Sequence, residues 1–231
     1  MANKSEVVFC EVFTGVVVVF SITLLVRVWW VLGRRRRDVR KRENPVKTLI
    51  VAGSGGHTSE ILRLMSGLSS MYDPRIYVVA DTDKMSTEKI ETFENERKPQ
   101  KEDKDAKEDQ TTKDYEIITV PRSREVRQSW VTSVITTLKA MVASFPLVFK
   151  CRPELVIVNG PGTCIPICAA AIVMKILGLQ DTTIVYVESV CRVQTLSLSG
   201  QILYHFADHF FVQWQQLQVK YPKAIYLGRL V

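Results

Sequence analysis

The sequence predicts an α/β protein, with a Rossmann-like parallel sheet covered by helices on both faces and preceded by one transmembrane helix. Three observations lead to this fold class. Apolar segments of strand length alternate with segments of helical periodicity, which is typical of βαβ units. The strand segments are apolar throughout, as expected for strands that are buried on both sides. A long apolar stretch precedes them, and 231 residues suffice for one domain and such an appendage.

Residues 1–33 are predicted to form a transmembrane anchor. The uncharged stretch 12–26 is shorter than the roughly 20 residues that a bilayer core needs, but the charged side chains at its ends can extend to the interface. Trp29 and Trp30 lie where an interfacial aromatic belt is expected. A cleaved signal peptide fits less well, because arginines follow the apolar run where a small-residue cleavage site would lie. A buried soluble helix is the other alternative, and it would not account for the paired tryptophans beside a basic run.

Residues 34–45 are predicted to be a polybasic linker. Within it, the run from Arg34 to Arg42 holds seven cations and one anion. The whole chain has a net charge of +7, so nearly all of the excess lies in this one segment. Charge confined in this way argues against a nucleic-acid-binding domain, and a cationic flank is expected to stay on the cytosolic side of a membrane.

Residues 46–231 are predicted to form one domain. Strands are expected at 46–52, 75–80, 115–120, 154–159 and 183–188, followed by short strands at 209–213 and 224–228. Helices are expected from Ile61 onward, where apolar residues recur at helical spacing, and at 128–149 and 163–177. Between the second and third strands, residues 95–114 hold six cations, seven anions and almost no apolar residue. This composition predicts a disordered charged insertion on the surface.

The cysteines and histidines do not predict a metal site. The five cysteines form no CxxC pair, which fits reduced thiols in the cytosol. Cys164 and Cys168 share a helical face, and packing is the expected reason. His205 and His209 have the same spacing, but no carboxylate motif such as HExxH accompanies them.

The first glycine-rich loop, GSGGHT, follows the first strand and leads into a helix. Glycines permit a tight turn, and the N-terminus of a helix directs N–H groups of partial positive charge toward an anion. Thr58 or Ser59 is expected to cap the helix. His57 lies at the rim, where its imidazole could donate to a phosphate or accept a proton from a hydroxyl. A turn needed only for packing is the alternative, because the loop lacks the GK[ST] of a P-loop. The phosphate-binding residues predicted here are Gly53, Ser54, Gly55, Gly56 and Thr58.

Two further loops are expected at the same edge of the sheet, because the carboxyl ends of parallel strands meet there. In the loop after the fourth strand, Gly160, Gly162 and Thr163 are predicted to bind a phosphate. After the fifth strand, Glu188 could accept a hydroxyl or act as a base, and Arg192 could bind a diphosphate. The simpler alternative is an ion pair between these two residues at the surface. Together the loops predict a phosphate-bearing ligand.

At this point the sequence resembles a known family, the membrane-anchoring subunit of a bipartite glycosyltransferase. That eukaryotic enzyme adds the second N-acetylglucosamine to a dolichol-diphosphate-linked oligosaccharide on the cytosolic face of the endoplasmic reticulum. The resemblance covers nearly all of residues 46–231, and only the charged insertion departs from the shorter family version. It is carried by the stretches VAGSGGHTSEIL, PRSREVRQSW, VNGPGTCIPIC, VYVESVCRVQTLSLSG and FVQWQQLQVKYPKAIYLGRLV.

The resemblance implies one half of an enzyme. The chain looks like the N-terminal half of a GT-B glycosyltransferase, similar to the bacterial enzyme that glycosylates undecaprenyl-linked muramyl intermediates. In that bacterial enzyme the first loop binds the acceptor and its phosphate. The resemblance assigns this role to the glycines of the first loop and His57 here, and it assigns the role of the second loop to Gly160 and Gly162. A soluble catalytic subunit would supply the other half and hold UDP-N-acetylglucosamine, which is a substrate, so no cofactor is expected. The family subunit recruits that partner to the membrane.

The end of the chain agrees with this interpretation. The last residues, YLGRLV, are apolar and no second domain follows them, so we expect an unfinished apolar surface that meets the partner. Simple fraying of the terminus is the alternative. The interface residues predicted here are Leu227, Leu230 and Val231.

The expected function is therefore a single-pass, membrane-anchoring and acceptor-binding subunit at the endoplasmic reticulum, with its globular domain in the cytosol. Its acceptor would be dolichyl-diphosphate-GlcNAc, with His57 activating the attacking 4-hydroxyl and Glu188 as the alternative base. An anchored NAD(P)-dependent oxidoreductase is one alternative, because Asp81 and Asp83 follow the second strand where a ribose-binding acid belongs. A non-catalytic adaptor with a vestigial site is another.

Overall fold

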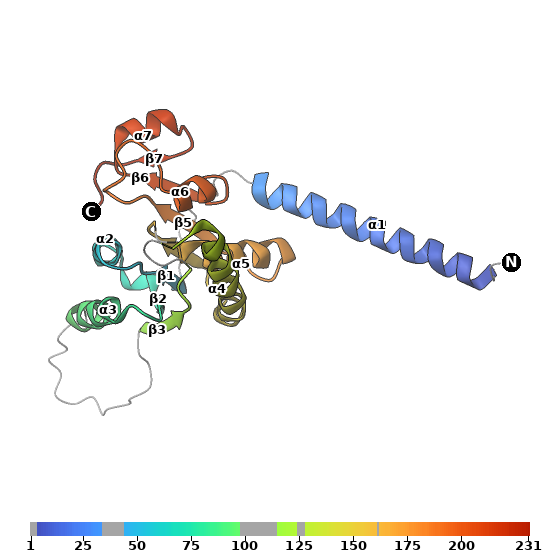
Figure 1. The fold of residues 1–231 in the computed structure, drawn as a ribbon, viewed down its shortest axis with the longest axis horizontal. Helices are drawn as coiled ribbons and strands as arrows, with labels where there is room; N and C mark the ends of the chain where they lie inside the picture. Colours follow the sequence, from blue (N-terminus) through green and yellow to red (C-terminus); the bar gives the residue numbers. More distant parts are fainter. Residues whose placement is uncertain (1–3, 34–43, 98–114, 124–127, 161) are drawn as a thin grey trace, which may run out of the picture.

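The computed structural model of the protein describes residues 4–33, 44–97, 115–123, 128–160 and 162–231. A long helix, α1 (Lys4–Gly33), projects from a three-layer α/β body (Figure 1). The predicted polybasic linker lies mostly outside the described residues, as do residues 98–114 of the predicted insertion.

In the described part of the chain, seven parallel strands form one sheet in the order β3-β2-β1-β4-β5-β6-β7. The predicted parallel sheet is thereby confirmed, with strand ends that differ by at most two residues. The strands are β1 (Thr48–Val51), β2 (Arg75–Ala80), β3 (Tyr115–Val120), β4 (Leu155–Val158), β5 (Thr183–Val187), β6 (His209–Val212) and β7 (Ile225–Tyr226).

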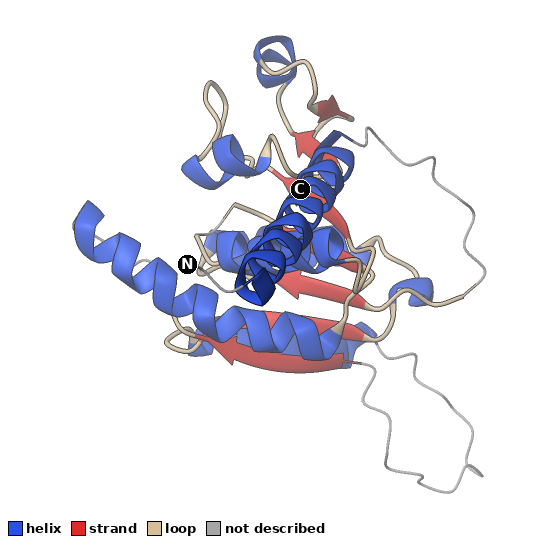
Figure 2. Ribbon diagram, turned by 90° about the vertical axis from the view of Figure 1, so that its right-hand side faces the viewer, coloured by secondary structure: helices blue, strands red, loops and turns tan. Residues whose placement is uncertain are grey.

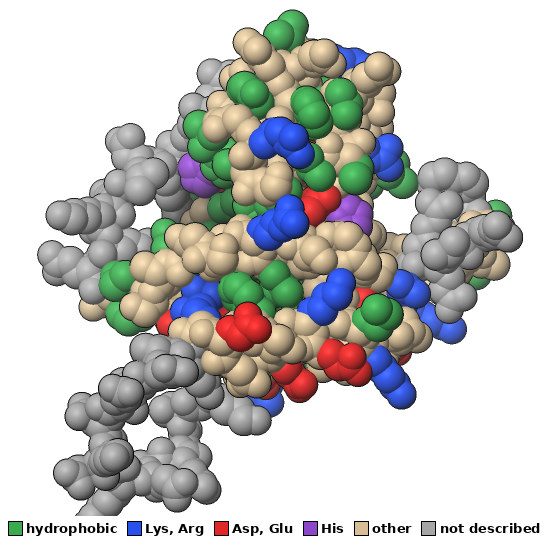
Figure 3. Space-filling model, turned by 90° about the vertical axis from the view of Figure 1, so that its left-hand side faces the viewer, with side chains coloured by type: hydrophobic (Ala, Val, Ile, Leu, Met, Phe, Trp, Pro, Cys, Tyr) green, Lys and Arg blue, Asp and Glu red, His purple; other side chains and the backbone are tan. Residues whose placement is uncertain are grey.

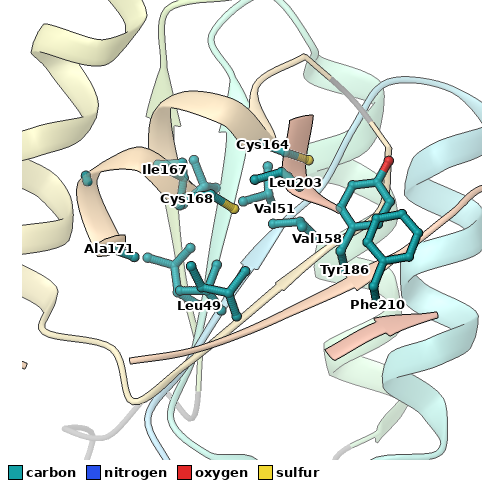
Figure 4. Close-up of a cluster of buried hydrophobic side chains, with 14 of the residues drawn as sticks. Leu49, Val51, Val158, Cys164, Ile167, Cys168, Ala171, Tyr186, Leu203 and Phe210 are labelled. Carbon is teal, nitrogen blue, oxygen red and sulfur yellow. The ribbon is translucent and has the colours of Figure 1, made fainter. Parts of the chain in front are cut away.

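Helices cover both faces of the sheet, as predicted. Because side chains alternate along a strand, Leu49 and Val51 of β1 lie in one apolar cluster and Ile50 lies in the other. The first cluster, drawn in Figure 4, includes residues of α4 (Trp130–Cys151), α5 (Cys164–Leu177), α6 (Leu198–Leu203) and α7 (Gln215–Lys220). The second cluster includes residues of α2 (Gly56–Ser66) and α3 (Lys84–Arg97). Figure 1 shows α2 and α3 on one side of the strands and α4 and α5 on the other.

Three short or polar helices were not predicted: α3, α6 and α7. For α3 the reason is that its buried residues, Ser86, Ile90 and Glu94, make no apolar stripe from which a helix could be predicted. Its last turn also includes residues 95–97, so the predicted start of the disordered insertion is wrong by three residues.

A buried ionic network joins α3 to the start of β2. The Arg75 side chain is fully buried, and its guanidinium lies 3.4 Å from Glu94 Oε1 and 3.2 Å from Asp73 Oδ1. Arg97 closes the network at 2.9 Å from Glu94 and 3.0 Å from Asp73. The Tyr77 hydroxyl donates to Glu94, and burial first, then this carboxylate, raises the pKa of Tyr77. The polar inner face of α3 is therefore held by paired charges.

The α1 helix is a candidate membrane anchor. Its segment Glu11–Val31 has a mean hydropathy of 2.2, and none of that segment is buried in the body. The end of α1 contacts α5, where Arg27 Nε donates to the carbonyl of Ile176 over 3.0 Å. The segment Val131–Cys151 of α4 is also long and apolar enough to cross a membrane, but 22% of it is buried in the body.

We expect Arg75→Ala to lower the free energy of unfolding by about 3–5 kcal/mol, because it removes a fully buried side chain and one of the two cations that pair with the buried Glu94 carboxylate. Lys84→Ala on the exposed side of α3 is the matched control and should change it by less than about 0.5 kcal/mol. Chemical unfolding of the detergent-solubilised full chain, followed by circular dichroism, measures both. Equal stability of the two variants would contradict the role given to Arg75.

Candidate functional site

The order of the strands creates a crevice at the centre of the sheet. From β1 the chain moves outward to β2 and β3, then returns to pair β4 with the other side of β1. At such a switch point the connections leave in opposite directions, and ligands of open α/β sheets bind there, beyond the carboxyl ends of the strands. The two predicted glycine loops follow β1 and β4, so they lie at the same edge of the sheet, as predicted.

The first loop turns at Gly55 into the N-terminus of α2. Gly55 has a φ of 63°, a conformation that favours glycine, and α2 begins at Gly56. No side chain caps this helix. A Cβ atom built on either glycine would have no heavy atom within 4 Å, so the space beside the first turn is open. The arrangement fits an anion held by the backbone N–H groups of the first turn of α2.

The prediction that Thr58 or Ser59 caps α2 is wrong, because this helix has no side-chain cap. The side chain of Thr58 is buried, and its hydroxyl donates to the carbonyl of Gly53 and lies 2.6 Å from Ser86 Oγ. Ser86 in turn lies 2.6 Å from the carboxylate of Asp83. Thr58 therefore fastens the first loop to α3, and its hydroxyl faces away from the open space.

The two glycine loops meet through His57. Gly160 has a φ of 69°, and a Cβ atom there would lie 2.8 Å from Cε1 of the His57 ring. Position 160 therefore requires glycine for two independent reasons. Beside it, Asn159 Oδ1 lies 2.9 Å from His57 Nδ1.

A chain of buried hydrogen bonds sets the orientation of the Asn159 amide. Asn159 Nδ2 donates to Glu60 Oε2 over 3.0 Å and to the carbonyl of Val187 over 3.3 Å. The other oxygen of Glu60 accepts from Ser189 Oγ over 2.8 Å. Because Asn159 turns its oxygen to His57, the imidazole must donate from Nδ1. In the neutral imidazole, Nε2 then carries the lone pair that can accept a proton.

Glu188 is fully buried and organises the loop after β5. Its carboxylate accepts the N–H groups of Ser197 and Ser189 over 2.9 and 3.1 Å. Burial raises the pKa of Glu188, and these N–H donors partly oppose the shift. A Cβ atom at Gly200 would collide with the same carboxylate, so the glycine lets α6 approach it. The contacts describe a residue that holds a loop in place.

A pocket of about 400 Å³ lies where these groups meet. The predicted residues Gly56, His57, Gly160, Glu188 and Arg192 line it together. Arg192 is exposed and lies at its rim beside Cys191.

The other predicted phosphate-binding residues do not line this pocket. Ser54 and Gly55 are exposed in the first loop, whereas Gly53 is buried. Gly162 lies beside Ser123, and Thr163 follows it directly as the N-cap of α5.

Glu60, Asn159 and Ser197 were not predicted as site residues. Glu60 had one signal in the sequence, since it follows His57 by three positions on α2 and so shares its helical face. Asn159 ends a strand, which is a common place for a functional polar residue, but its partner Glu60 lies 99 positions away. No local pattern could reveal that pair.

The end of the chain is tied to the same region through the buried side chain of Gln213. Its amide oxygen accepts the N–H groups of Leu230 and Val231 over 3.2 and 3.3 Å. Its amide nitrogen donates to the carbonyl of Glu188 over 3.0 Å. Leu227 is 66% exposed. The role of these last residues in a partner interface stays a prediction.

Among the described residues, no group of three or more His, Cys, Asp or Glu side chains is arranged to hold a metal ion. Cys164 and Cys168 are buried in the first apolar cluster, and burial raises the pKa of Cys168 to about 12. These two thiols are packing residues.

Fold and pocket together define a class of protein: an open parallel α/β protein with a candidate membrane-spanning helix and a pocket at the switch point of its sheet. The chain belongs to the family described as "Oligosaccharide biosynthesis protein Alg14 like", whose model matches residues 48–230. This confirms the family resemblance of the sequence.

Curated relatives agree over nearly the whole chain. The human protein named "UDP-N-acetylglucosamine transferase subunit ALG14" is 54% identical over 217 residues, which are 94% of this chain and 95% of the relative. The protein of the same name from Schizosaccharomyces pombe is 37% identical over 222 residues, covering 94% and 97%. Among solved structures, MurG of Acinetobacter baumannii is 15% identical with a TM-score of 0.48, covering 74% of this chain and 41% of that chain.

Gly160→Ala should cost about 1–3 kcal/mol of stability and displace the His57 ring, because alanine is strained at this φ and its methyl group meets the ring. Gly162→Ala is the matched control, since the nearest atom to its Cβ position is 3.9 Å away. Thermal unfolding of the two variants checks the stability. The contact between the loops would be disproved if both alanines were tolerated equally.

Glu188→Gln should lower the free energy of unfolding by about 1–3 kcal/mol, because the amide nitrogen would face an N–H group that now donates to the carboxylate. Glu116→Gln on the exposed side of β3 is the control. A Glu188→Gln protein as stable as the control would contradict the role of Glu188 in organising the loop.

Proposed function

We propose that this protein is the membrane-anchoring, acceptor-binding subunit of a UDP-N-acetylglucosamine transferase. It would recruit a soluble catalytic subunit to the cytosolic face of the endoplasmic reticulum membrane. The complex would add the second N-acetylglucosamine to dolichyl-diphosphate-GlcNAc in the synthesis of the N-glycan precursor. Family membership and the names of the relatives support the subunit role.

One observation carries the acceptor-binding part of the proposal. His57 lies in the pocket with Nδ1 bonded to Asn159, so Nε2 is the nitrogen that can accept a proton. A sugar hydroxyl that attacks an activated sugar must lose its proton, and a positioned imidazole is a suitable general base. We assign this role to His57, with the 4-hydroxyl of the acceptor sugar as the group it deprotonates.

The acceptor also carries a diphosphate, which needs compensation for its charge. The uncapped first turn of α2 offers backbone N–H groups, and Arg192 offers a cation at the rim of the pocket. Gly56 of this turn and Arg192 line the pocket together with His57. The UDP-sugar would enter from the partner subunit, which completes the cleft. Neither a metal nor a cofactor is part of this proposal.

The alternatives have less support. For an NAD(P)-dependent oxidoreductase, Asp81 or Asp83 would bind ribose, but the Asp83 carboxylate accepts the N–H group of Ser86 over 3.1 Å at the start of α3. Family membership also favours a transferase subunit. An adaptor with a vestigial site would have no need of an oriented histidine, and experiment can separate it from the main proposal.

The test is co-expression with the catalytic subunit, followed by an assay of N-acetylglucosamine transfer to a lipid-diphosphate-GlcNAc acceptor. We expect His57→Ala to lower the rate about 10²- to 10⁴-fold, because the general base is lost. Co-purification of the two subunits should be unchanged, since His57 is not among the predicted interface residues Leu227, Leu230 and Val231.

His205→Ala is the matched control, because His205 is exposed and does not line the pocket. Its activity should equal that of the wild type. Full activity of the His57→Ala complex would support the adaptor instead, and no transfer by the wild-type complex would refute the proposed reaction.

A further inference from the structure

Glu60 is a buried acid that makes no ion pair in the described part of the chain. Its two oxygens accept hydrogen bonds from neutral groups, Asn159 Nδ2 over 3.0 Å and Ser189 Oγ over 2.8 Å. The buried Glu94, by contrast, pairs with two arginines. On the surface, Figure 3 shows acidic and basic side chains mixed with one another. A buried carboxylate without a cation lowers the stability of a fold, so Glu60 indicates a role in function.

The pocket that Glu60 lines offers one side chain that can become positive beside it, namely His57. Both residues lie on one face of α2, three positions apart, and both line the pocket. A single amide joins them, because Asn159 Oδ1 lies 2.9 Å from His57 Nδ1 and Asn159 Nδ2 lies 3.0 Å from Glu60 Oε2. Among the residues that line the pocket, Arg192 is the only lysine or arginine, and it is exposed.

The orientation of this amide is fixed by a third partner. Asn159 Nδ2 also donates to the carbonyl of Val187 over 3.3 Å, and a carbonyl oxygen can only accept a hydrogen bond. The nitrogen therefore faces Glu60, and the oxygen faces His57. The contacts form because β1, β4 and β5 are neighbours in a parallel sheet, whose strands Figure 2 shows side by side. Hydrogen bonds in such a chain polarise one another, so the carboxylate makes Asn159 Oδ1 a stronger acceptor.

We propose that Glu60 stabilises, through Asn159, the positive charge that His57 gains during the reaction. In that step the O–H bond of the acceptor hydroxyl breaks, its proton forms a bond with His57 Nε2, and the imidazole becomes a cation. The transient imidazolium is thus the cation that Glu60 lacks in the resting protein. The carboxylate is in place before the proton arrives, so no rearrangement is needed at that moment.

Glu60 and Asn159 are then positioning residues, because each acts on the acceptor only through His57. The geometry is that of an acid behind a histidine base, with one amide inserted between them. The inference rests on the proposed role of His57 as the base. It adds the charge that the protein supplies behind that base.

The first test is Glu60→Gln in the complex with the catalytic subunit, assayed by transfer to a lipid-diphosphate-GlcNAc acceptor. The glutamine can keep both hydrogen bonds, since its oxygen accepts from Asn159 and its nitrogen donates to the Ser189 hydroxyl, but it removes the charge. We expect kcat to fall about 10- to 100-fold while KM for the acceptor changes less than about twofold. Glu88→Gln on α3 is the matched control, because Glu88 is exposed, and its kcat should equal that of the wild type.

The second test is a double-mutant cycle with Asn159→Ala. Because Glu60 acts through this amide, adding Glu60→Gln to Asn159→Ala should lower kcat no further. Effects that multiply would overturn the inference, since they mean that Glu60 acts on the acceptor directly. A wild-type kcat for Glu60→Gln, together with a slow His57→Ala complex, would overturn it as well and would leave the proposed function standing.

The third test reads the histidine itself and needs neither partner nor acceptor. The full chain in detergent is labelled with ¹⁵N in histidine only, and nuclear magnetic resonance locates the ring protons. The chain has three histidines, so His57→Ala identifies the signals of His57. At a pH where the ring is neutral, we expect the proton on Nδ1 in the wild type and in Glu60→Gln, and a share of it on Nε2 in Asn159→Ala.

A proton on Nε2 of His57 in the wild type would overturn the inference. The same would follow if Asn159→Ala left the proton entirely on Nδ1, because the amide would then not hold it. Failure of the proposed function has a different signature. The ring would show the expected Nδ1 proton while the His57→Ala complex kept full activity, and this result would refute the base and the inference with it.

Discussion

The contact between His57 and the Asn159–Gly160 segment holds the candidate site together, because it joins the loops that follow β1 and β4. The contact is possible only because position 160 has no side chain. The hydrogen bonds from Asn159 to Glu60 and from Ser189 to Glu60 then connect a third loop, which follows β5. Three strand ends that are distant in sequence thus share one buried polar network, and the pocket lies above it.

Buried polar groups have two different uses in this fold. Around Arg75 they take the place of an apolar stripe and attach a polar helix to the edge of the sheet. Around Glu188 they fix the course of the loop after β5, which lines the pocket. In both places each charge has partners, which is the condition under which charges are tolerated inside a protein.

Much of the fold could be predicted because its signals are local. Continuous apolar runs mark β1, β4 and β5, and glycines mark the turns that follow the first two. The helix α3 was missed because the residues on its inner side are polar and depend on partners from β2. The capping role predicted for Thr58 was wrong for the same reason, since the sequence places it at a helix start but only the fold brings Ser86 to its side chain. Of the predicted residues, Gly56, Gly160 and His57 line the pocket. Glu60 and Asn159 were not predicted, since their pairing needs two distant elements.

The Gln213 side chain has a consequence for assembly. One amide group bonds the N–H groups of Leu230 and Val231 and also the backbone of Glu188, whose carboxylate holds one wall of the pocket. A molecule that bound the last two residues would either compete with the Gln213 amide for their N–H groups or stabilise these hydrogen bonds. Binding at the end of the chain and binding in the pocket would then be linked. If binding at the chain end changes the affinity of the pocket by some factor, occupation of the pocket changes the affinity of the chain end by the same factor.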